Sequence, residues 1–236
     1  MQVRRVSAAV VTTLVVGGVM GAPGVAAAAP TGSARPTTPE SQLLLGPGEF
    51  PVGYQYVAVS PRDLADVGSA IGSVLAHGSV TPAGCVQLPS AAMFAHSAAS
   101  TNLSLAVNKT RRSSLSEALL AGGGHARHSL PARCRHLRLR FAVPDTGGSV
   151  DERLDISGIR PAGVPADAVV ISEQATGTVT GRGRTVPLRQ SQLIGMAPVR
   201  GYAVMVQAIT TNAGPADMAG FTTTLARAVD KVARAR

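Results

Sequence analysis

Alternating apolar and polar positions run through the second half of the chain and predict β-strands. In residues 136–143 the leucines and the phenylalanine alternate with basic and small residues, which indicates one buried face and one exposed basic face. Residues 150–156 and 166–179 predict two further strands, and the second has a middle that is apolar on both faces. Residues 181–210 predict a hairpin, with one strand ending near Met196 and the next starting near Tyr202, joined by the turn "APVRG".

The first half of the chain predicts a mixture of helices and strands. Ser41 can cap a short apolar turn at Leu43–Leu45, and residues 54–59 predict a strand that Pro61 ends. Apolar residues spaced by three and four then predict a helix that Gly78 ends. A period-2 pattern at 103–107 predicts a strand that turns Leu103, Leu105 and Val107 toward the core.

Three more helices are expected. A short one is possible from Ser90, and residues 113–121 predict a helix that Ser113 or Ser114 caps and that turns its leucines inward. The last 23 residues predict a C-terminal helix with one apolar face, which comprises Phe221, Leu225, Val229 and Val232. Runs of consecutive strands with a few helices indicate an α+β fold, a mostly antiparallel sheet with helices packed against it.

The N-terminus has the three-part pattern of a secretory signal peptide. Arg4 and Arg5 precede an uncharged apolar run that is shorter than the roughly 20 residues needed to span a bilayer, and small residues follow it. We therefore expect a signal peptide over 1–28, a disordered leader over 29–40, and one secreted α+β domain over 41–236. No cysteine follows the apolar run, which argues against a lipid anchor, and no later run predicts a transmembrane segment.

The chain is basic, with a formal net charge of +9. Outside the cell such a surface meets anionic partners, including cell-wall polymers, phospholipid head groups and acidic sugars. The alternative is a solvated basic surface with no dedicated ligand, since net charge by itself defines no site. The candidate basic surface is the exposed face that holds Arg135, Arg138 and Arg140.

Cys85 and Cys134 are the only cysteines, and an exported chain enters an oxidising compartment in which disulfides persist. A bridge between them closes a loop of about 50 residues and removes roughly 4 kcal/mol of chain entropy from the unfolded state. The competing interpretation is a metal site built from Cys134 with His125, His128 and His136. The spacing matches no zinc pattern and arginines lie among the ligands, so we expect no metal.

The sequence contains no recognised catalytic motif, and we expect neither enzyme activity nor a cofactor. Asp151, Glu152 and Asp155 could supply an acid/base pair, but glycosidases also need aromatic platforms for sugar, and this chain has few aromatics. Pairing of these acids with the neighbouring basic strand is the alternative. The same scarcity of stacking aromatics, together with export, argues against nucleic-acid binding.

Three segments resemble a family. "LLLGPGEFPVGYQ", "TPAGCVQL" and "RCRHLRLRF" are similar to segments of small secreted proteins of mycobacteria and related actinobacteria, a family of unknown function related to the extracellular sensor domains of PknH-type receptor kinases. The resemblance implies an α+β domain, a disulfide between the two matching cysteines, and a groove for an extracellular ligand. The chain lacks the lipobox cysteine and the kinase domain of those relatives, so membrane anchoring and signalling are not implied.

These observations lead to two hypotheses of function. The first is a secreted, non-enzymatic binding or sensor-like domain at the cell envelope, with an unknown extracellular ligand. The second is a carrier of a lipid or another apolar molecule in a cavity between the sheet and the helices, because Val, Leu and Ala greatly outnumber aromatic residues.

Overall fold

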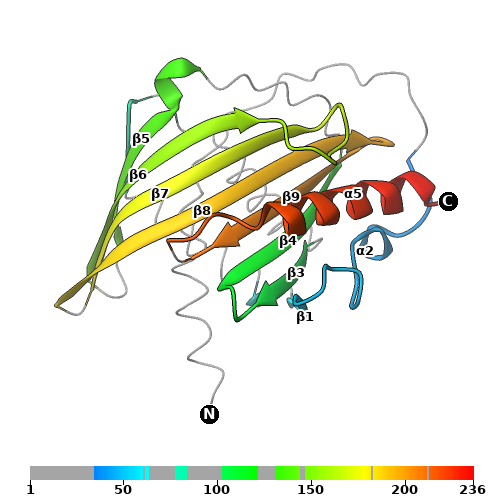
Figure 1. The fold of residues 1–236 in the computed structure, drawn as a ribbon, viewed down its shortest axis with the longest axis horizontal. Coiled ribbons are helices and arrows are strands. Elements are labelled where there is room, and N and C mark those ends of the chain that lie inside the picture. The colour runs from blue at the N-terminus through cyan, green and yellow to red at the C-terminus, as the bar shows by residue number, and fades with distance from the viewer. Residues whose placement is uncertain are drawn as a thin grey trace, which may run out of the picture.

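A nine-stranded antiparallel sheet forms most of the computed structural model, which describes residues 35–60, 62–63, 78–83, 85, 103–121, 131–143, 147–181, 183–211 and 213–236. Across the sheet the strands follow the order β1-β3-β4-β9-β8-β7-β6-β5-β2. Their bounds are β1 Gln55–Val57, β2 Gly78–Thr81, β3 Leu103–Asn108, β4 Ser113–Ala121, β5 His136–Val143, β6 Gly148–Ile159, β7 Val169–Gly181, β8 Arg184–Val199 and β9 Tyr202–Thr210. Figure 1 shows the long strands β6 to β8 crossing the twisted sheet diagonally. The α+β fold with a mostly antiparallel sheet is confirmed.

Strands β5 to β9 form a meander in which each strand pairs with the next along the chain. The predicted hairpin of β8 and β9 is present, and its turn is shorter than "APVRG" because β8 continues to Val199. Arg200 and Gly201 make this turn, and both have positive φ, as a tight two-residue hairpin turn requires. The sequence pattern therefore located this half of the sheet correctly.

One face of the sheet is covered by the C-terminal helix α5, Met218–Arg234, with the short helix α2, Glu40–Leu43, beside it (Figure 1). Asp217 caps α5, since its Oδ1 accepts the Gly220 N–H at 3.0 Å. The helix lies close to β8, because a Cβ added at Gly195 would come within 2.6 Å of Phe221. Buried residues of this core include Leu43, Leu45, Leu115, Leu119, Val204, Val206, Phe221, Leu225 and Val232.

The opposite face of the sheet carries a second core, centred on β5 to β7. It contains Cys85, Cys134, Leu137, Leu139, Phe141, Val150, Leu154, Ile156, Ile171 and Ala175. The register puts the predicted inward-facing residues of β5 on this face, and they are buried as expected. Among the described residues, no helix is long and apolar enough to cross a membrane.

Residues 113–121 form strand β4, so the helix predicted there is wrong. Neither Ser113 nor Ser114 caps a helix, because both pair with β9 and β3. The leucines split between the two faces of the sheet: Leu115 and Leu119 lie in the core under α5, and Leu120 faces the other way. A central strand that is buried on both faces loses its alternation, and its apolar spacing then imitates that of a helix.

Three other details differ from the sequence predictions. In β3 the more deeply buried residues are Ser104, Ala106 and Asn108, so the predicted orientation of this strand is wrong. Small side chains suit this face because they lie under the 43–45 segment, and Ser104 Oγ donates to the Leu45 carbonyl. Gly78 begins strand β2, and Ser41 lies inside α2, whose N-cap is Pro39. The helix predicted to end at Gly78 and the one from Ser90 lie outside the described residues.

Candidate functional site

The predicted disulfide is present, with the Cα atoms of Cys85 and Cys134 5.4 Å apart. Both cysteines are buried in the core on the face away from α5, and Cys134 lies two residues before the start of the basic strand β5. A bridged sulfur is no thiolate ligand, which removes Cys134 from the metal alternative. In the described part of the chain no group of three or more potential ligand residues exists, and His125 and His128 lie outside that part.

The candidate basic surface is largely paired with acidic residues of the next strand. Arg138 donates from Nε and Nη2 to the two oxygens of Asp151, at 2.8 and 2.7 Å, and Arg140 Nε reaches the same carboxylate at 3.1 Å. The hydrogen bonds from Arg138 are the main reason why the pKa of Asp151 falls to about 2. His136 meets Asp155 at 2.6 Å, and Arg135 is exposed where the 3-10 turn Ala132–Cys134 ends. Asp151 and Asp155 therefore pair with the neighbouring basic strand, as the alternative predicted, and two guanidinium groups on one carboxylate leave a single net positive charge.

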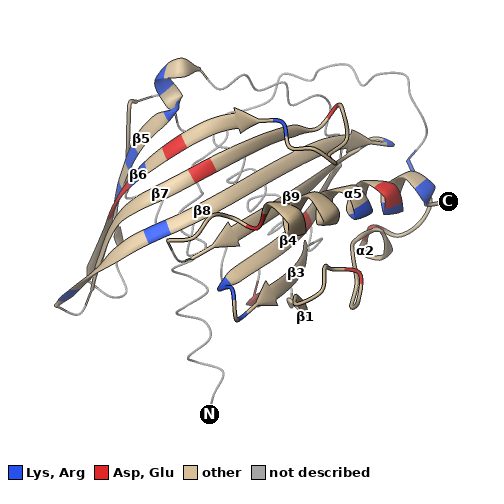
Figure 2. Cartoon of the chain, viewed as in Figure 1, with Lys and Arg blue, Asp and Glu red and all other residues tan. Residues whose placement is uncertain are grey.

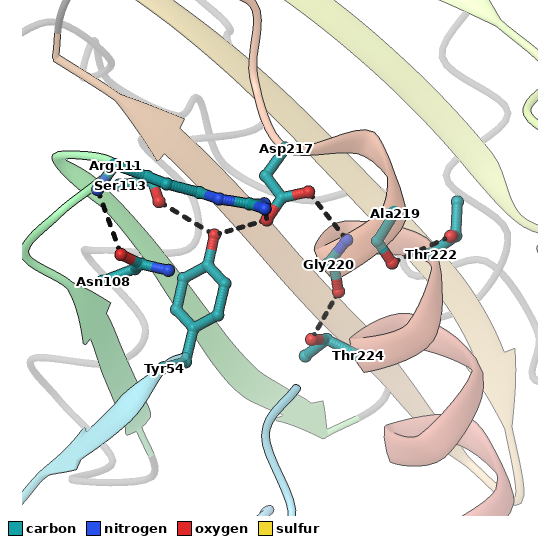
Figure 3. Close-up of polar contacts among 9 residues, drawn as sticks. All are labelled: Tyr54, Asn108, Arg111, Ser113, Asp217, Ala219, Gly220, Thr222 and Thr224. Carbon is teal, nitrogen blue, oxygen red and sulfur yellow. Dashed lines mark hydrogen bonds and ion pairs between the residues drawn. The ribbon is translucent and has the colours of Figure 1, made fainter. Parts of the chain in front are cut away.

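A second polar cluster joins three segments at the N-terminus of α5 (Figure 3). The Tyr54 hydroxyl lies 2.9 Å from Ser113 Oγ and donates to Asp217 Oδ2 at 3.0 Å, and Arg111 Nη1 donates to the same oxygen at 3.1 Å. Burial raises the pKa of Tyr54 to about 12, so the phenol stays protonated at neutral pH. Because both oxygens of Asp217 accept hydrogen bonds here, the cluster fixes the start of α5 and has no free base to offer to a substrate.

The "LLLGPGEF" motif is a clamp between the sheet and α5. The Leu45 N–H donates to Glu117 Oε2 on β4 at 2.7 Å. Lys231 Nζ on α5 donates to the Leu44 carbonyl at 2.7 Å and to Glu49 Oε2 at 2.6 Å. A hollow of about 620 Å³ lies beside the clamp, and Arg227, Lys231 and Arg234 line it. Each of the three cations already binds a protein oxygen, so their charges are partly engaged within the protein.

The most unusual chemistry lies on the sheet face away from α5. We call Glu152, Glu173, Gln190 and Gln192 the buried polar patch. Opposite residues of an antiparallel pair share a face, and Glu173 is opposite Gln192, while Gln190 is opposite Ala175. Glu152 lies on the same face, because it belongs to the buried row of β6 that includes Ile156, and Ile156 is opposite Glu173. Figure 2 shows acidic positions within β6 and β7, well away from the charged end of α5.

The four side chains are almost completely buried, with exposed fractions of 0% for Glu152, 2% for Glu173, and 3% for each glutamine. Gln190 Nε2 donates to Gln192 Oε1 at 3.4 Å, and this is the hydrogen bond that the structure records within the patch. Within the part of the chain that the structure describes, six atoms of the patch have no hydrogen-bond partner: both carboxyl oxygens of each glutamate, Gln190 Oε1 and Gln192 Nε2. Most buried polar atoms in folded proteins are paired, so this concentration on one face requires an explanation.

Burial keeps both glutamates protonated at neutral pH. It raises the pKa of Glu152 to about 9, with a further contribution from the nearby charge of Glu173, and it raises the pKa of Glu173 to about 8. Glu117 is a third buried acid, with a pKa raised to about 8 by burial, but it lies on the other face and binds Leu45. Carboxyl groups in this state can donate as well as accept hydrogen bonds.

The β7 residues between the two glutamates on this face are small, and Leu154 of β6 lies opposite one of them, Ala175. Gly177 lies opposite Glu152, and Ala175 lies on β7 two residues from each of Gly177 and Glu173. A side chain at Gly177 is excluded, because its Cβ would meet the backbone oxygen of Asp151 at 2.1 Å. Strand β7 therefore places no large side chain between the two carboxyl groups.

The patch was not predicted from the sequence. Glu152 was grouped with Asp151 and Asp155 in one exposed cluster, although the alternation puts Glu152 in the row of Val150, Leu154 and Ile156. A glutamate at an apolar-face position was the available signal, and the same signal exists for Glu173 between Ile171 and Ala175.

Searches against known protein families, curated proteins and solved structures found no match.

Proposed function

We propose that this protein is an extracellular, non-enzymatic ligand-binding domain and that its ligand occupies the buried polar patch. The observation that carries the proposal is the set of six buried polar atoms, on one face of the sheet, that have no hydrogen-bond partner among the described residues. Each buried, unsatisfied group costs about 1–3 kcal/mol, whereas an apolar residue of similar size at the same position costs none of this. A ligand that supplies the missing partners gives the four residues a reason to be polar.

The chemistry of the patch suits ligand binding. With pKa values of about 9 and 8, Glu152 and Glu173 are neutral at pH 7 in the ligand-free protein, and each carboxyl can then donate as well as accept a hydrogen bond. The sequence contains no recognised catalytic motif, which favours binding over catalysis. The disulfide between Cys85 and Cys134 suits an oxidising extracellular location, which supports the secreted, envelope-associated part of the proposal.

The second hypothesis, a carrier of a lipid or another apolar molecule, is favoured by the surroundings of the patch. Leu154, Ile156, Ile171 and Ile194 share its face of the sheet and are buried. A ligand with an apolar body and a polar head would contact both kinds of surface. An entirely apolar ligand would leave the six polar atoms unpaired, so the binding-domain proposal ranks first.

The test is native mass spectrometry of the protein purified from the organism that produces it, compared with the double variant Glu152→Leu/Glu173→Leu. We expect the wild type to carry a bound small molecule and the double variant to be bare. We also expect the variant to be more stable, because it removes four unpaired oxygens from the core. A bare wild-type mass, or the same adduct on both proteins, would contradict the proposal.

A further inference from the structure

We infer that the ligand of the buried polar patch is a linear aliphatic diamine, with one ammonium group at each glutamate and its carbon chain over Ala175. This inference rests on the proposed function and adds the chemical class of the ligand. It follows from the hydrogen-bonding atoms that the patch leaves free, from the charges on the same face, and from the spacing of the two glutamates.

The free atoms are mostly acceptors when the two carboxyls are ionised. Glu152 and Glu173 then supply four acceptor oxygens and Gln190 Oε1 supplies a fifth, whereas Gln192 Nε2 is the single unpaired donor group. A partner for such a set is rich in donors and poor in acceptors. An alkylammonium group has three N–H donors and no acceptor, and it carries the charge that stabilises a buried carboxylate.

The charges on this face disfavour an anion and favour a cation. In the described parts of β4 to β9, Glu152 and Glu173 are the titratable side chains that are buried on this face. Arg184 shares the face but is exposed at the start of β8, beyond Leu188 from the patch, and Arg138 and Arg140 bind Asp151 on the other face. A ligand with positive charge is therefore the group that would allow both carboxyls to ionise while buried.

The spacing of the glutamates suits a ligand with two cationic ends. Glu152 is opposite Gly177, and Glu173 lies four residues along β7 from Gly177. At about 3.4 Å per residue along a strand and about 4.8 Å between strands, their Cα atoms are roughly 14 Å apart. Side chains of a strand stand roughly perpendicular to the sheet, so the two carboxyl groups are about as far apart as the Cα atoms. A contact of about 3 Å between each carboxylate and its ammonium nitrogen leaves about 8 Å between the two nitrogens, which a five-carbon chain spans. The paired residues Ala175 and Leu154 lie beneath the middle of that chain.

Binding must release protons. Without ligand both carboxyls hold a proton at pH 7, and a bound ammonium group stabilises the carboxylate, so each glutamate that pairs with an ammonium releases up to one proton to the buffer. The affinity should consequently rise from pH 6 to about pH 9, and it should fall once the amines lose their own protons near pH 10.

The experiment is isothermal titration calorimetry of the full chain with 1,5-diaminopentane at pH 7, in two buffers that differ in ionisation enthalpy. We expect binding with net proton release, weakened at least tenfold by Glu152→Gln and by Glu173→Gln. 1-Aminopentane should bind at least tenfold more weakly than the diamine, and 1,5-pentanediol should not bind. Glu117→Gln is the matched control, since it alters a buried acid on the opposite face and should leave the affinity unchanged.

Three results would overturn the inference: no binding of the diamine, binding without proton release, or patch variants that bind the diamine as tightly as the wild type does. Glutamine is isosteric with the protonated glutamate, so the variants should keep the fold, which circular dichroism checks. If the diamine fails to bind while native mass spectrometry still shows an adduct that depends on Glu152 and Glu173, the diamine is wrong and the binding function stands.

Discussion

The stability of this protein should fall as the pH rises from 5 to 7, and Glu152 and Glu173 should be a main cause. In the unfolded chain both carboxyls ionise near the ordinary glutamate pKa of 4.5, but in the fold their pKa values are about 9 and 8. The folded state therefore binds more protons than the unfolded state between these limits. The stabilisation is fully present below pH 4.5 and is lost progressively until the pH passes the folded pKa values.

The size of the effect follows from linkage. Each carboxyl lowers the free energy of unfolding by about 1.3 kcal/mol per pH unit, so the two together remove on the order of 5 kcal/mol between pH 5 and pH 7. The double variant Glu152→Gln/Glu173→Gln cannot ionise at these positions and should lose much less. Its remaining decline should come in part from Glu117, whose pKa is also raised.

Urea unfolding followed by circular dichroism at pH 5, 6 and 7 measures these free energies for the ligand-free protein. The exposed variant Asp167→Asn serves as the control and should follow the wild type. The reasoning would be refuted by a wild-type free energy that stays constant over this range, or by a double variant whose free energy falls as steeply as that of the wild type.

Three further changes test the fold. Cys85→Ser/Cys134→Ser should lower the free energy of unfolding by about 4 kcal/mol, because the bridge closes a loop with a sequence separation of 49; an equal free energy in urea would contradict this. Asp217→Ala should cost about 1–2 kcal/mol through loss of the α5 cap, seen as a lower melting temperature, with Asp167→Asn unchanged. Gly195→Ala should cost about 1–3 kcal/mol, because the new methyl group meets Phe221; a wild-type melting temperature would show that α5 lies farther from β8.

The sequence predicted best where one face of an element is buried and the other is exposed. Strand β5 and helix α5 are of this kind, and the alternation of Leu137, Leu139 and Phe141 identified the correct buried face. Strand β4 is buried on both faces, so its leucines had no period of two and were mistaken for a helix stripe. Pairing with distant β9 stabilises β4, and a local pattern does not contain that contact.

The candidate site was predicted less well, for a related reason. The disulfide between Cys85 and Cys134 was predicted correctly because a chain with two cysteines allows a single intramolecular pairing. The buried polar patch unites residues of β6, β7 and β8 that are up to 40 positions apart, and the register of three strands brings them together. The neighbouring residues also misled, because Glu152 was grouped with the solvent-accessible Asp151 and Asp155, whereas the alternation of the strand places it in the buried row.

The central claim is that two carboxyl groups lie buried and unpaired on one face of this sheet. A ¹³C NMR titration of the glutamate side-chain carboxyls in the ligand-free protein tests it most directly, with Glu152→Gln and Glu173→Gln assigning the signals. The account predicts that these two carboxyls titrate with pKa values of about 9 and 8, while exposed glutamates titrate near 4.5. Titration of both near 4.5 would mean that water or a protein partner already reaches them, and it would contradict both the binding proposal and the diamine.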